Sequence, residues 1–529
     1  MTQFRMWRSA GLRRGEMRHR NAGNAEGLRL FATMSIGRPL GQSTKAKTLV
    51  SRHFRWKSPV ASGFVGTGDR SLLIRLQTKK LWTSRMTNVA LTGLARDLAR
   101  RAAEGRPVRI GVIGSGEMGT DLVTQGMLMP GIAVCAVSTR RPHTARDAIR
   151  IAYGDEAMAV EADTASKVTA AIEEGKIAIT SNELLVTNPL IDVVIDATGK
   201  PGVAADFDLM AMEHGKHLVM MNVEADVTIG CYLKQQADRL GVVYSVGAGD
   251  EPSSCMELIE FASALGLTIV SAGKGKNNPL NHDAVPDDYR EEATRRNMNP
   301  RMLVEFVDGS KTMVEMCAIA NATGLVPDVP GMHGPKADRD DLVKVLIPRE
   351  DGGLLLKKGV VDYTIGKGVA PGVFVIVEAT HPRIVERMDD LHIGRGPYYS
   401  LFRPYHLTSL EVPLTAARIV LFGKPDMVPL PRPVAEVCAV AKRDLAAGEI
   451  FDAIGEACYR SWTMTVGDAR AQRAVPVGLL EGGKVLKPVR KGELLTADNA
   501  TPDRTTSLFA LRRLQDEMLY GNKPVVALS

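Results

Sequence analysis

The hydrophobic pattern of the chain is most regular between residues 106 and 246. Short apolar runs, each the length of a buried strand, occupy 108–113, 132–137, 191–195, 217–220 and 242–246. Amphipathic stretches with helical spacing lie between them, at 143–153, 204–214 and 227–240. Strands that alternate with helices predict a doubly wound α/β fold with a parallel sheet.

A glycine-rich turn joins the first of these strands to a helix that contains Leu122 and Leu128. Gly114, Gly116 and Gly119 form the pattern G-x-G-x-x-G. Between a strand and a helix, this pattern is typical of a Rossmann dinucleotide site: the glycines allow a tight turn, close approach of the pyrophosphate and close helix packing. A turn without a ligand is the alternative. The residues predicted to bind the dinucleotide here are Gly114, Ser115, Gly116, Glu117, Met118 and Gly119.

The end of the second strand indicates which dinucleotide is bound. An NAD enzyme places an acid there for the ribose hydroxyls, whereas this chain reads Ser138-Thr139-Arg140-Arg141,. Guanidinium groups pair with phosphate, so Ser138, Arg140 and Arg141 favour the 2′-phosphate of NADP(H). Solvated loop arginines are the alternative. At the nicotinamide side we place Ala197, Thr198, Gly199 and Asn222.

A second group of polar residues follows the last of these strands. It lies in three glycine-containing segments: 247–254, 271–278 and 308–315. Lysines here would hold a carboxylate or phosphate or polarise a carbonyl, and acids would act in proton transfer or bind a divalent cation. Surface charges and helix caps are the alternative for about half of them. The predicted catalytic residues are Asp250, Glu251, Lys274, Lys276, Lys311 and Glu315, with Asp250, Glu251 and Glu315 as candidate metal ligands.

The remainder of the chain is less informative. The segment 402–406 offers Arg403 and His406 as residues that could reach a substrate. A histidine packed beside Tyr405 is the alternative and explains the segment equally well. Two similar units, 439–450 and 489–495, each carry a Gly-Glu pair between strand-like runs and predict a small β-rich module. A helix over 508–520 follows it.

Charge is unevenly distributed along the 529 residues. Residues 1–85 hold 18 Lys or Arg and 3 Asp or Glu, so the rest of the chain carries −8 although the total is +7. The basic total is therefore no argument for a nucleic-acid partner. We interpret residues 1–85 as a disordered extension or the product of a misplaced start codon, with an Arg-rich transit peptide as the alternative. No catalytic residue is expected there.

Composition excludes two other classes. No apolar run reaches about 18 residues, so we expect no membrane span or membrane partner. The six cysteines are scattered without metal or disulfide spacing, which is typical of reduced thiols in a cytoplasmic protein,. The domains we expect are the 1–85 extension, an NADP-binding domain over 86–247, a catalytic and dimerisation domain over 248–433, and a small β domain with a C-terminal helix over 434–529.

From Met86 onward the chain resembles the 1-deoxy-D-xylulose-5-phosphate reductoisomerase-like (DRL) family, whose N-terminal domain is similar to that of homoserine dehydrogenase. The stretches that carry the resemblance include VRIGVIGSGEMGTDLV, GAGDEPSSCMELIEF, SAGKGKNNPLN and RPYHLTSLEVPLTAARIV. The resemblance implies a Rossmann domain, an α+β catalytic domain and a C-terminal β-clip module of the SAF type. It also implies a homodimer or larger homo-oligomer.

The same resemblance implies an activity in isoprenoid biosynthesis: NADPH-dependent conversion of 1-deoxy-D-xylulose 5-phosphate to 2-C-methyl-D-erythritol 4-phosphate, with Mg²⁺ or Mn²⁺. Homoserine dehydrogenases carry a lysine after the conserved asparagine, whereas this chain reads Asn222-Val223-Glu224. That departure argues against homoserine as the substrate. The alternatives are a dehydrogenase of a polyol or sugar acid and, in another class, a non-catalytic NADP-binding sensor.

Overall fold

The structure is a computed structural model, and it describes residues 90–296 and 298–521. The expectation for residues 1–85 lies outside these described residues. Each predicted strand of the first half of the chain forms, with bounds that differ by no more than two residues from the apolar runs. Among the described residues, no helix has the length and apolar character needed to cross a membrane. All six cysteines are buried and free.

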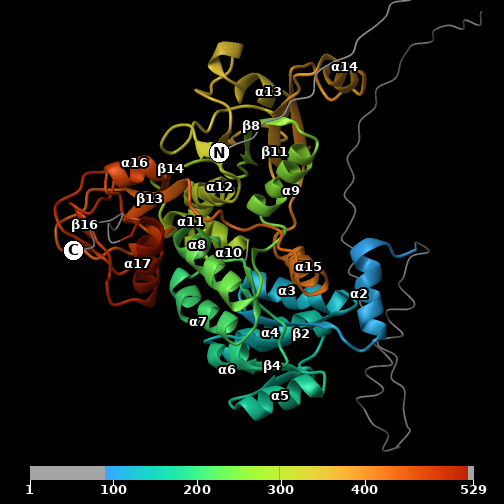
Figure 1. The fold of residues 1–529 in the computed structure, drawn as a ribbon. Coiled ribbons are helices and arrows are strands. Elements are labelled where there is room, and N and C mark those ends of the chain that lie inside the picture. Colours follow the sequence, from blue (N-terminus) through green and yellow to red (C-terminus); the bar gives the residue numbers. More distant parts are fainter. Residues whose placement is uncertain (1–89, 297, 522–529) are drawn as a thin grey trace, which may run out of the picture. The chain divides into compact units, whose positions relative to one another are not determined.

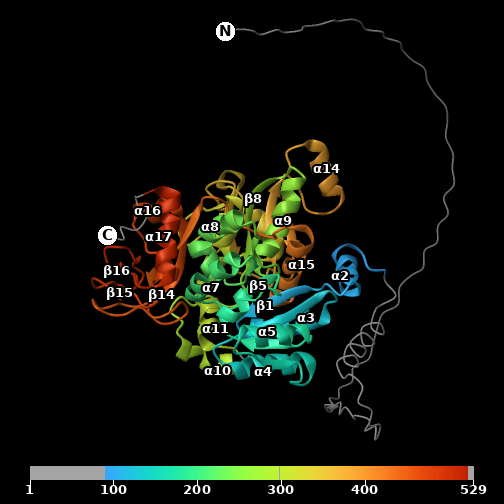
Figure 2. The same ribbon diagram turned by 60° about the horizontal axis from the view of Figure 1, so that its bottom comes forward.

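The first sheet has seven parallel strands in the order β3-β4-β2-β1-β5-β6-β7. The order reverses between β1 and β5, which lie side by side at the centre of the sheet (Figure 2). In a doubly wound sheet, ligands bind at the carboxyl ends of the strands at this reversal. The strands are β1 (Val108–Ile113), β2 (Ile132–Ser138), β3 (Ala159–Glu161), β4 (Ile177–Thr180), β5 (Val193–Asp196), β6 (His217–Met220) and β7 (Tyr244–Val246).

Helices join these strands and bury apolar faces against the sheet. The pattern predicted four of them, although two begin three and four residues earlier than expected, at Pro201 and Val223; β3, β4 and the two helices that flank β4 were not expected from it. These helices are α2 (Gly93–Ala103), α3 (Glu117–Leu128), α4 (Pro142–Tyr153), α5 (Ala165–Glu173), α6 (Asn182–Thr187), α7 (Pro201–Glu213) and α8 (Val223–Leu240).

The second sheet has five strands in the order β12-β11-β8-β10-β9 and is mixed. The strand β10 runs parallel to β8, whereas β11 is antiparallel to β8 and to β12. Its strands are β8 (Thr268–Gly275), β9 (Val326–Pro327), β10 (Val360–Thr364), β11 (Val373–Glu378) and β12 (Tyr398–Arg403).

Around this sheet, α12 is the most deeply buried helix, with contacts to α8, α9, β10 and β14 (Figure 1). The helix α15 returns to the first sheet, where it packs on β1 and β6. The helices are α9 (Glu251–Ala264), α10 (Arg290–Arg295), α11 (Pro300–Val307), α12 (Ser310–Thr323), α13 (Leu342–Val345), α14 (Pro382–Asp390) and α15 (Val412–Phe422), and the 3₁₀ turns are η1 (Pro286–Tyr289), η2 (Arg339–Asp341), η3 (Arg349–Asp351) and η4 (Thr408–Leu410).

The last part of the chain contains two small antiparallel sheets and a helix that packs on α7 and α8 (Figure 1). The two predicted Gly-Glu units pair with each other, through bridges such as Leu445 with Val489. The predicted domain boundaries stay predictions. The elements are β13 (Ala435–Ala441), β14 (Tyr459–Thr465), α16 (Val466–Ala471), η5 (Val477–Leu479), β15 (Lys484–Val485), β16 (Ala500–Thr501) and α17 (Ser507–Tyr520).

Candidate active site

The glycine-rich turn lies between β1 and α3, as the sequence predicted. Gly114 has φ +107°, and a Cβ there would lie 2.9 Å from the Ala197 carbonyl oxygen. A Cβ on Gly119 would lie 2.1 Å from the Gly114 carbonyl oxygen, so this glycine allows the helix to start close to the strand,. No described protein atom lies within 4 Å of the Cβ position at Gly116, which borders the cavity described below. The space beside Gly116 is therefore open to a ligand.

The end of β2 presents two arginines without partners. Arg140 and Arg141 are exposed and line the same cavity, and neither guanidinium has a hydrogen bond or ion pair to any described residue. The Ser138 hydroxyl is buried and also has no partner among them. The Ser115 hydroxyl, in contrast, is held by Thr144 at 2.5 Å. The two guanidiniums remain free to bind an anion.

The loop after β5 is organised by the buried carboxylate of Asp196. This carboxylate accepts hydrogen bonds from the Thr198 backbone N–H (2.9 Å), the Thr198 hydroxyl (2.6 Å) and the Asn222 amide (2.9 Å). Burial raises the pKa of Asp196, and these hydrogen bonds oppose that rise,. Ala197, Thr198 and Gly199 line the cavity, whereas Asn222 is fully buried and holds the loop against the start of α8.

Lys274 forms the centre of a buried charge network that three elements supply. Its ammonium lies 2.5 Å from Glu251 Oε1, at the start of α9, and also contacts Glu315 of α12. The side chains of all three are at most 12% exposed. Burial would lower the pKa of Lys274, but the two carboxylates outweigh burial and raise it. For Glu315, burial and then repulsion by Glu251 raise the pKa to about 8. Lys274 and Glu251 are therefore charged, whereas Glu315 takes up a proton more readily than an ordinary glutamate.

The alternation of β8 explains how two lysines reach this network. Lys274, in the strand, and Lys276, directly after it, are two residues apart and so point to one face. The glycines before and between them meet neighbouring backbone, since a Cβ on Gly273 would lie 1.6 Å from the Asp362 carbonyl oxygen and one on Gly275 2.2 Å from the Val369 carbonyl oxygen. Lys276 donates to the Phe306 carbonyl at the end of α11. Burial lowers its pKa to about 8, and the Lys274 charge adds to this effect.

Lys311 lies one helical turn before Glu315 on α12 and lines the cavity. Its ammonium lies 3.1 Å from Glu224 Oε1 in the first turn of α8. Although burial lowers the pKa of Lys311, Glu224 and Asp250 raise it well above its ordinary value. For Asp250, burial raises the pKa to about 6, and Lys311 opposes that rise. Lys311 is therefore held as an ammonium.

Glu224, Glu305 and His406 are among the lining residues that lie outside the predicted catalytic set. Gly249 has φ +93° and a Cβ there would lie 2.3 Å from the Thr408 carbonyl oxygen, so the 247–251 and 403–411 segments are tightly joined. That contact brings His406 Nε2 to 3.3 Å from Glu251 Oε1, while Nδ1 faces the Gly249 carbonyl at 3.1 Å. Arg403 instead pairs with Glu411 at 2.6 Å and does not line the cavity.

One acid–histidine group has the spacing of a metal site. Ligand atoms of Asp250, Glu251 and His406 lie within 4.8 Å of one another. Two carboxylates and an imidazole are a donor set that suits Mn²⁺ or Mg²⁺ with additional water. The third candidate from the sequence, Glu315, does not belong to this group; it pairs with Lys274, which also contacts Glu251.

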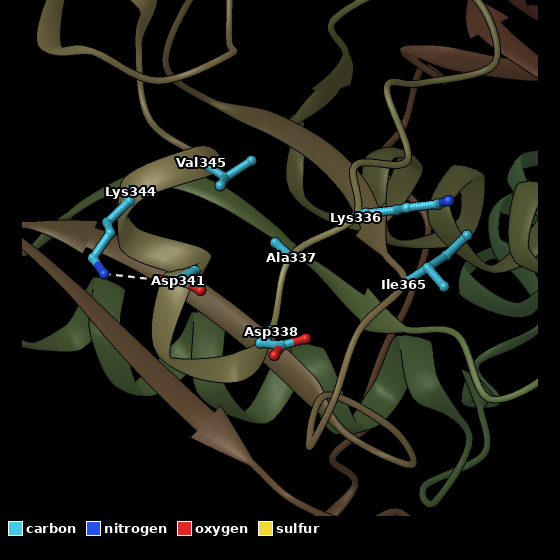
Figure 3. Close-up of a pocket in the computed structure, with 7 residues that line it drawn as sticks. All are labelled: Lys336, Ala337, Asp338, Asp341, Lys344, Val345 and Ile365. Atoms are coloured by element: carbon cyan, nitrogen blue, oxygen red, sulfur yellow. Dashed lines mark hydrogen bonds and ion pairs between the residues drawn. The ribbon is translucent and has the colours of Figure 1, made fainter.

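Most of these groups border one cavity of 720 Å³. It extends from the glycine-rich turn, past the 197–199 loop, to the network around Lys274 and Lys311, and α11 forms part of its wall. All six predicted catalytic residues line it. A second pocket, of 470 Å³, shares no lining residue with it; Lys336, Asp338, Asp341 and Lys344 are among the residues that border this pocket (Figure 3).

The fold and the cavity are those of a Rossmann-type α/β protein, and a family model adds the oxidoreductase class. Residues 249–412 match the family model "Oxidoreductase DRL, catalytic domain". This stretch is similar to the DRL catalytic domain, in agreement with the resemblance seen in the sequence. No curated protein matches.

Solved structures are similar only at a low level. A "probable dehydrogenase from Thermotoga maritima" has 14% identity and a TM-score of 0.35 over 60% of this chain and 90% of that chain. An "NAD binding oxidoreductase from Klebsiella pneumoniae" has 18% identity and a TM-score of 0.25 over 34% and 44%. A "DOX-P Reductoisomerase in complex with magnesium" has 10% identity and a TM-score of 0.32 over 60% and 70%. At these values the solved structures carry no argument about function.

Proposed function

We propose that this oxidoreductase uses NADP(H) to reduce a carbonyl group of a small polyhydroxylated substrate. The observation that carries the proposal is the continuity of one cavity between the glycine-rich turn, the 197–199 loop and the Lys–Glu network. A dinucleotide bound at the turn directs its nicotinamide toward that loop in a Rossmann domain. Arg140 and Arg141, which have no partner among the described residues, support the 2′-phosphate form of the cofactor,.

Lys311 is the group best suited to the carbonyl oxygen. The hydride adds to the carbonyl carbon, and the oxygen gains negative charge that an ammonium stabilises and then protonates. Lys311 is charged, lies beside the nicotinamide side and is held by Glu224. In this role it takes the place of the lysine that homoserine dehydrogenases carry at the position of Val223, although it comes from a different helix.

A divalent cation fits Asp250, Glu251 and His406. When bound, it supplies Lewis-acid polarisation of a substrate oxygen. The chain's own residues prepare this position: an Nδ1–H of His406 donating to the Gly249 carbonyl would leave Nε2 directed at Glu251. Lys274 keeps Glu251 ionised, since burial alone would raise the pKa of Glu251 and the lysine lowers it below its ordinary value.

For the particular reaction, we propose the conversion of 1-deoxy-D-xylulose 5-phosphate to 2-C-methyl-D-erythritol 4-phosphate. Its carbon skeleton rearranges through aldol cleavage and re-formation, and hydride then reduces the resulting aldehyde. One observation favours a second candidate, a sugar-acid or polyol dehydrogenase. Lys274 and Lys311 already face carboxylates and Lys276 a carbonyl, so no lysine of the network is unpaired for a phosphate.

The test is NADPH oxidation at 340 nm by the full chain with 1-deoxy-D-xylulose 5-phosphate and Mn²⁺ or Mg²⁺. Metal-dependent turnover supports the reductoisomerase reaction. Turnover of NADP⁺ with sugar acids or polyols, without activity on the phosphate, would favour the second candidate. NADPH binding measured by fluorescence without turnover of any of these substrates would contradict an enzyme and favour a sensor.

A further inference from the structure

Two helices that wall the cavity meet at one buried aspartate. The helix α11 supplies Glu305 and Phe306, and α12 supplies Lys311 and Glu315. Between them lies Asp308, whose side chain is 0% exposed and whose Oδ1 accepts from the Ser310 N–H at 2.7 Å. The position of this junction therefore sets the direction in which both helices present their side chains.

The cation that neutralises Asp308 comes from the C-terminal segment, residues 435–520. Lys442, directly after β13, places Nζ 2.7 Å from Asp308 Oδ2. The same ammonium donates to the carbonyls of Ala284 (2.8 Å) and Glu456 (2.7 Å). The ion pair and these two hydrogen bonds together hold the ammonium in one place. With its side chain 2% exposed, Lys442 is almost entirely withdrawn from water.

Further contacts from the same segment reach the two helices. The Ser461 N–H donates to Ser310 Oγ at 3.0 Å, and the Thr463 hydroxyl donates to the Met313 carbonyl of α12 at 2.7 Å. Gly455 packs against α11, where a Cβ would lie 2.5 Å from Glu305 Cγ. These polar contacts lie within the first turn of α12, directly beside Lys311.

We propose that Lys442 is a positioning residue for the active site, and that the C-terminal segment forms part of the framework of this site rather than a separable module. Through Asp308 it fixes the start of α12 and the end of α11, and so the places of Lys311, Glu315 and Glu305. The inference rests on the proposed function only in assigning chemistry to those side chains.

A neighbouring ion pair provides a matched control. Lys491 of the C-terminal segment pairs with Asp283 at 2.6 Å, one residue before Ala284, but both side chains are more than half exposed. Exposed pairs of this kind contribute little, because water screens them. Lys491→Met should therefore leave the site unchanged, although it removes a lysine that links the same two segments.

The test uses the double variant Lys442→Met with Asp308→Asn in the full chain. It leaves no unpaired buried charge, and the asparagine can still accept from Ser310. The first readout needs no substrate: trace acetylation of Lys276 as a function of pH, followed by mass spectrometry. Lys276 donates a hydrogen bond to the end of α11, and burial there lowers the pKa of Lys276 to about 8. Loosening of α11 would admit water and so raise the pKa of Lys276. A rise of about one unit lowers its reactivity at pH 8 about fivefold.

The second readout is kinetic. We expect kcat to fall at least about tenfold while the KM for NADPH stays within about twofold, because the glycine-rich turn does not contact this junction. Thr463→Val removes only one hydroxyl, and with it the hydrogen bond to the Met313 carbonyl. It should lower both the Lys276 reactivity and kcat, but by less than the double variant does. Unchanged Lys276 reactivity and kcat in both variants would overturn the proposal. If the wild type turns over no substrate, the proposed function fails, yet the acetylation profile still decides the role of Lys442.

Discussion

At the scale of single residues, the charges of the cavity balance one another before a ligand arrives. Lys274 lies between two glutamates and Lys311 faces a third, so each lysine is held in one place at the cost of part of its attraction for anions. Such an arrangement suits proton transfer and orientation of hydroxyl groups better than capture of a phosphate.

Replacing Lys311 by methionine tests its role as the acid. We expect kcat/KM to fall about 10²- to 10⁴-fold, the usual contribution of a positioned acid or base. The NADPH dissociation constant should change by less than about twofold, since Lys311 does not belong to the glycine-rich turn. Steady-state kinetics and fluorescence titration measure the two quantities. Lys344→Met, at an exposed lysine that pairs with Asp341, is the control; equal losses in both variants would contradict the assignment.

Glu305 makes stability depend on pH. Burial raises its pKa from 4.5 to about 8, and Arg301 opposes the rise. The folded state therefore binds this proton more tightly than the unfolded state does. Protonation of Glu305 contributes fully to the free energy of unfolding below about pH 4.5, and this contribution is lost as the pH rises through 8. Between pH 6 and 9, Glu305→Gln should reduce the decline in the free energy of unfolding by about 1–3 kcal/mol. Urea unfolding at both pH values measures this, with the exposed Glu517→Gln as the control.

At the scale of elements, the glycines of the β1–α3 turn have separable roles. A side chain at Gly116 meets no described protein atom, whereas one at Gly119 meets the Gly114 carbonyl. Gly116→Val should therefore fold normally but weaken NADPH binding at least about 100-fold, while Gly119→Val should lower the melting temperature. Fluorescence titration and thermal unfolding distinguish them. Tight NADPH binding by Gly116→Val would show that the dinucleotide does not bind at this turn.

The loop after β2 bears on cofactor choice. Arg140 and Arg141 have no described partner, so their removal should cost little stability. In the variant with alanine at both positions, NADPH affinity should fall about 10- to 100-fold, while NADH affinity stays nearly constant, because only NADPH carries the 2′-phosphate. Parallel titrations with both cofactors provide the measurement. Equal losses for the two would remove the phosphate interpretation.

The elements also show what the sequence could predict. The apolar runs at 108–113 and 217–220 coincide with strands, because a central parallel strand is buried on both faces,. The four-residue strand Ile177–Thr180 was missed because its neighbours, at 165–173 and 182–187, blur the contrast. All six predicted catalytic residues line the cavity, yet their pairing was not predictable, because Lys274 meets partners 23 and 41 positions away. Glu224 was missed because it lay before the predicted start of the helix at 227 and its partner Lys311 is 87 positions away.

At the scale of the whole molecule, the C-terminal segment is bound to helix α8 of the first half of the chain as well as to the cavity walls. Arg512 of α17 is 3% exposed; it pairs with Glu436 of β13 at 2.6 Å and with Asp516 at 2.9 Å, and it donates to the Thr228 carbonyl of α8 at 3.3 Å. One guanidinium thus joins α17, β13 and α8. The start of α8 carries Glu224, so this contact supports the helix that supplies the partner of Lys311.

Replacement of Arg512 by methionine leaves Glu436 and Asp516 buried without their cation. Breaking a buried pair in this way typically costs about 3–5 kcal/mol, because the remaining charge cannot be solvated. We expect a loss of that size in the free energy of unfolding, measured with guanidinium chloride. Arg513, the next residue, pairs with Glu517 in a largely exposed position, so Arg513→Met should cost less than about 1 kcal/mol,. If the two variants were equally stable, α17 would not be holding the C-terminal segment to α8.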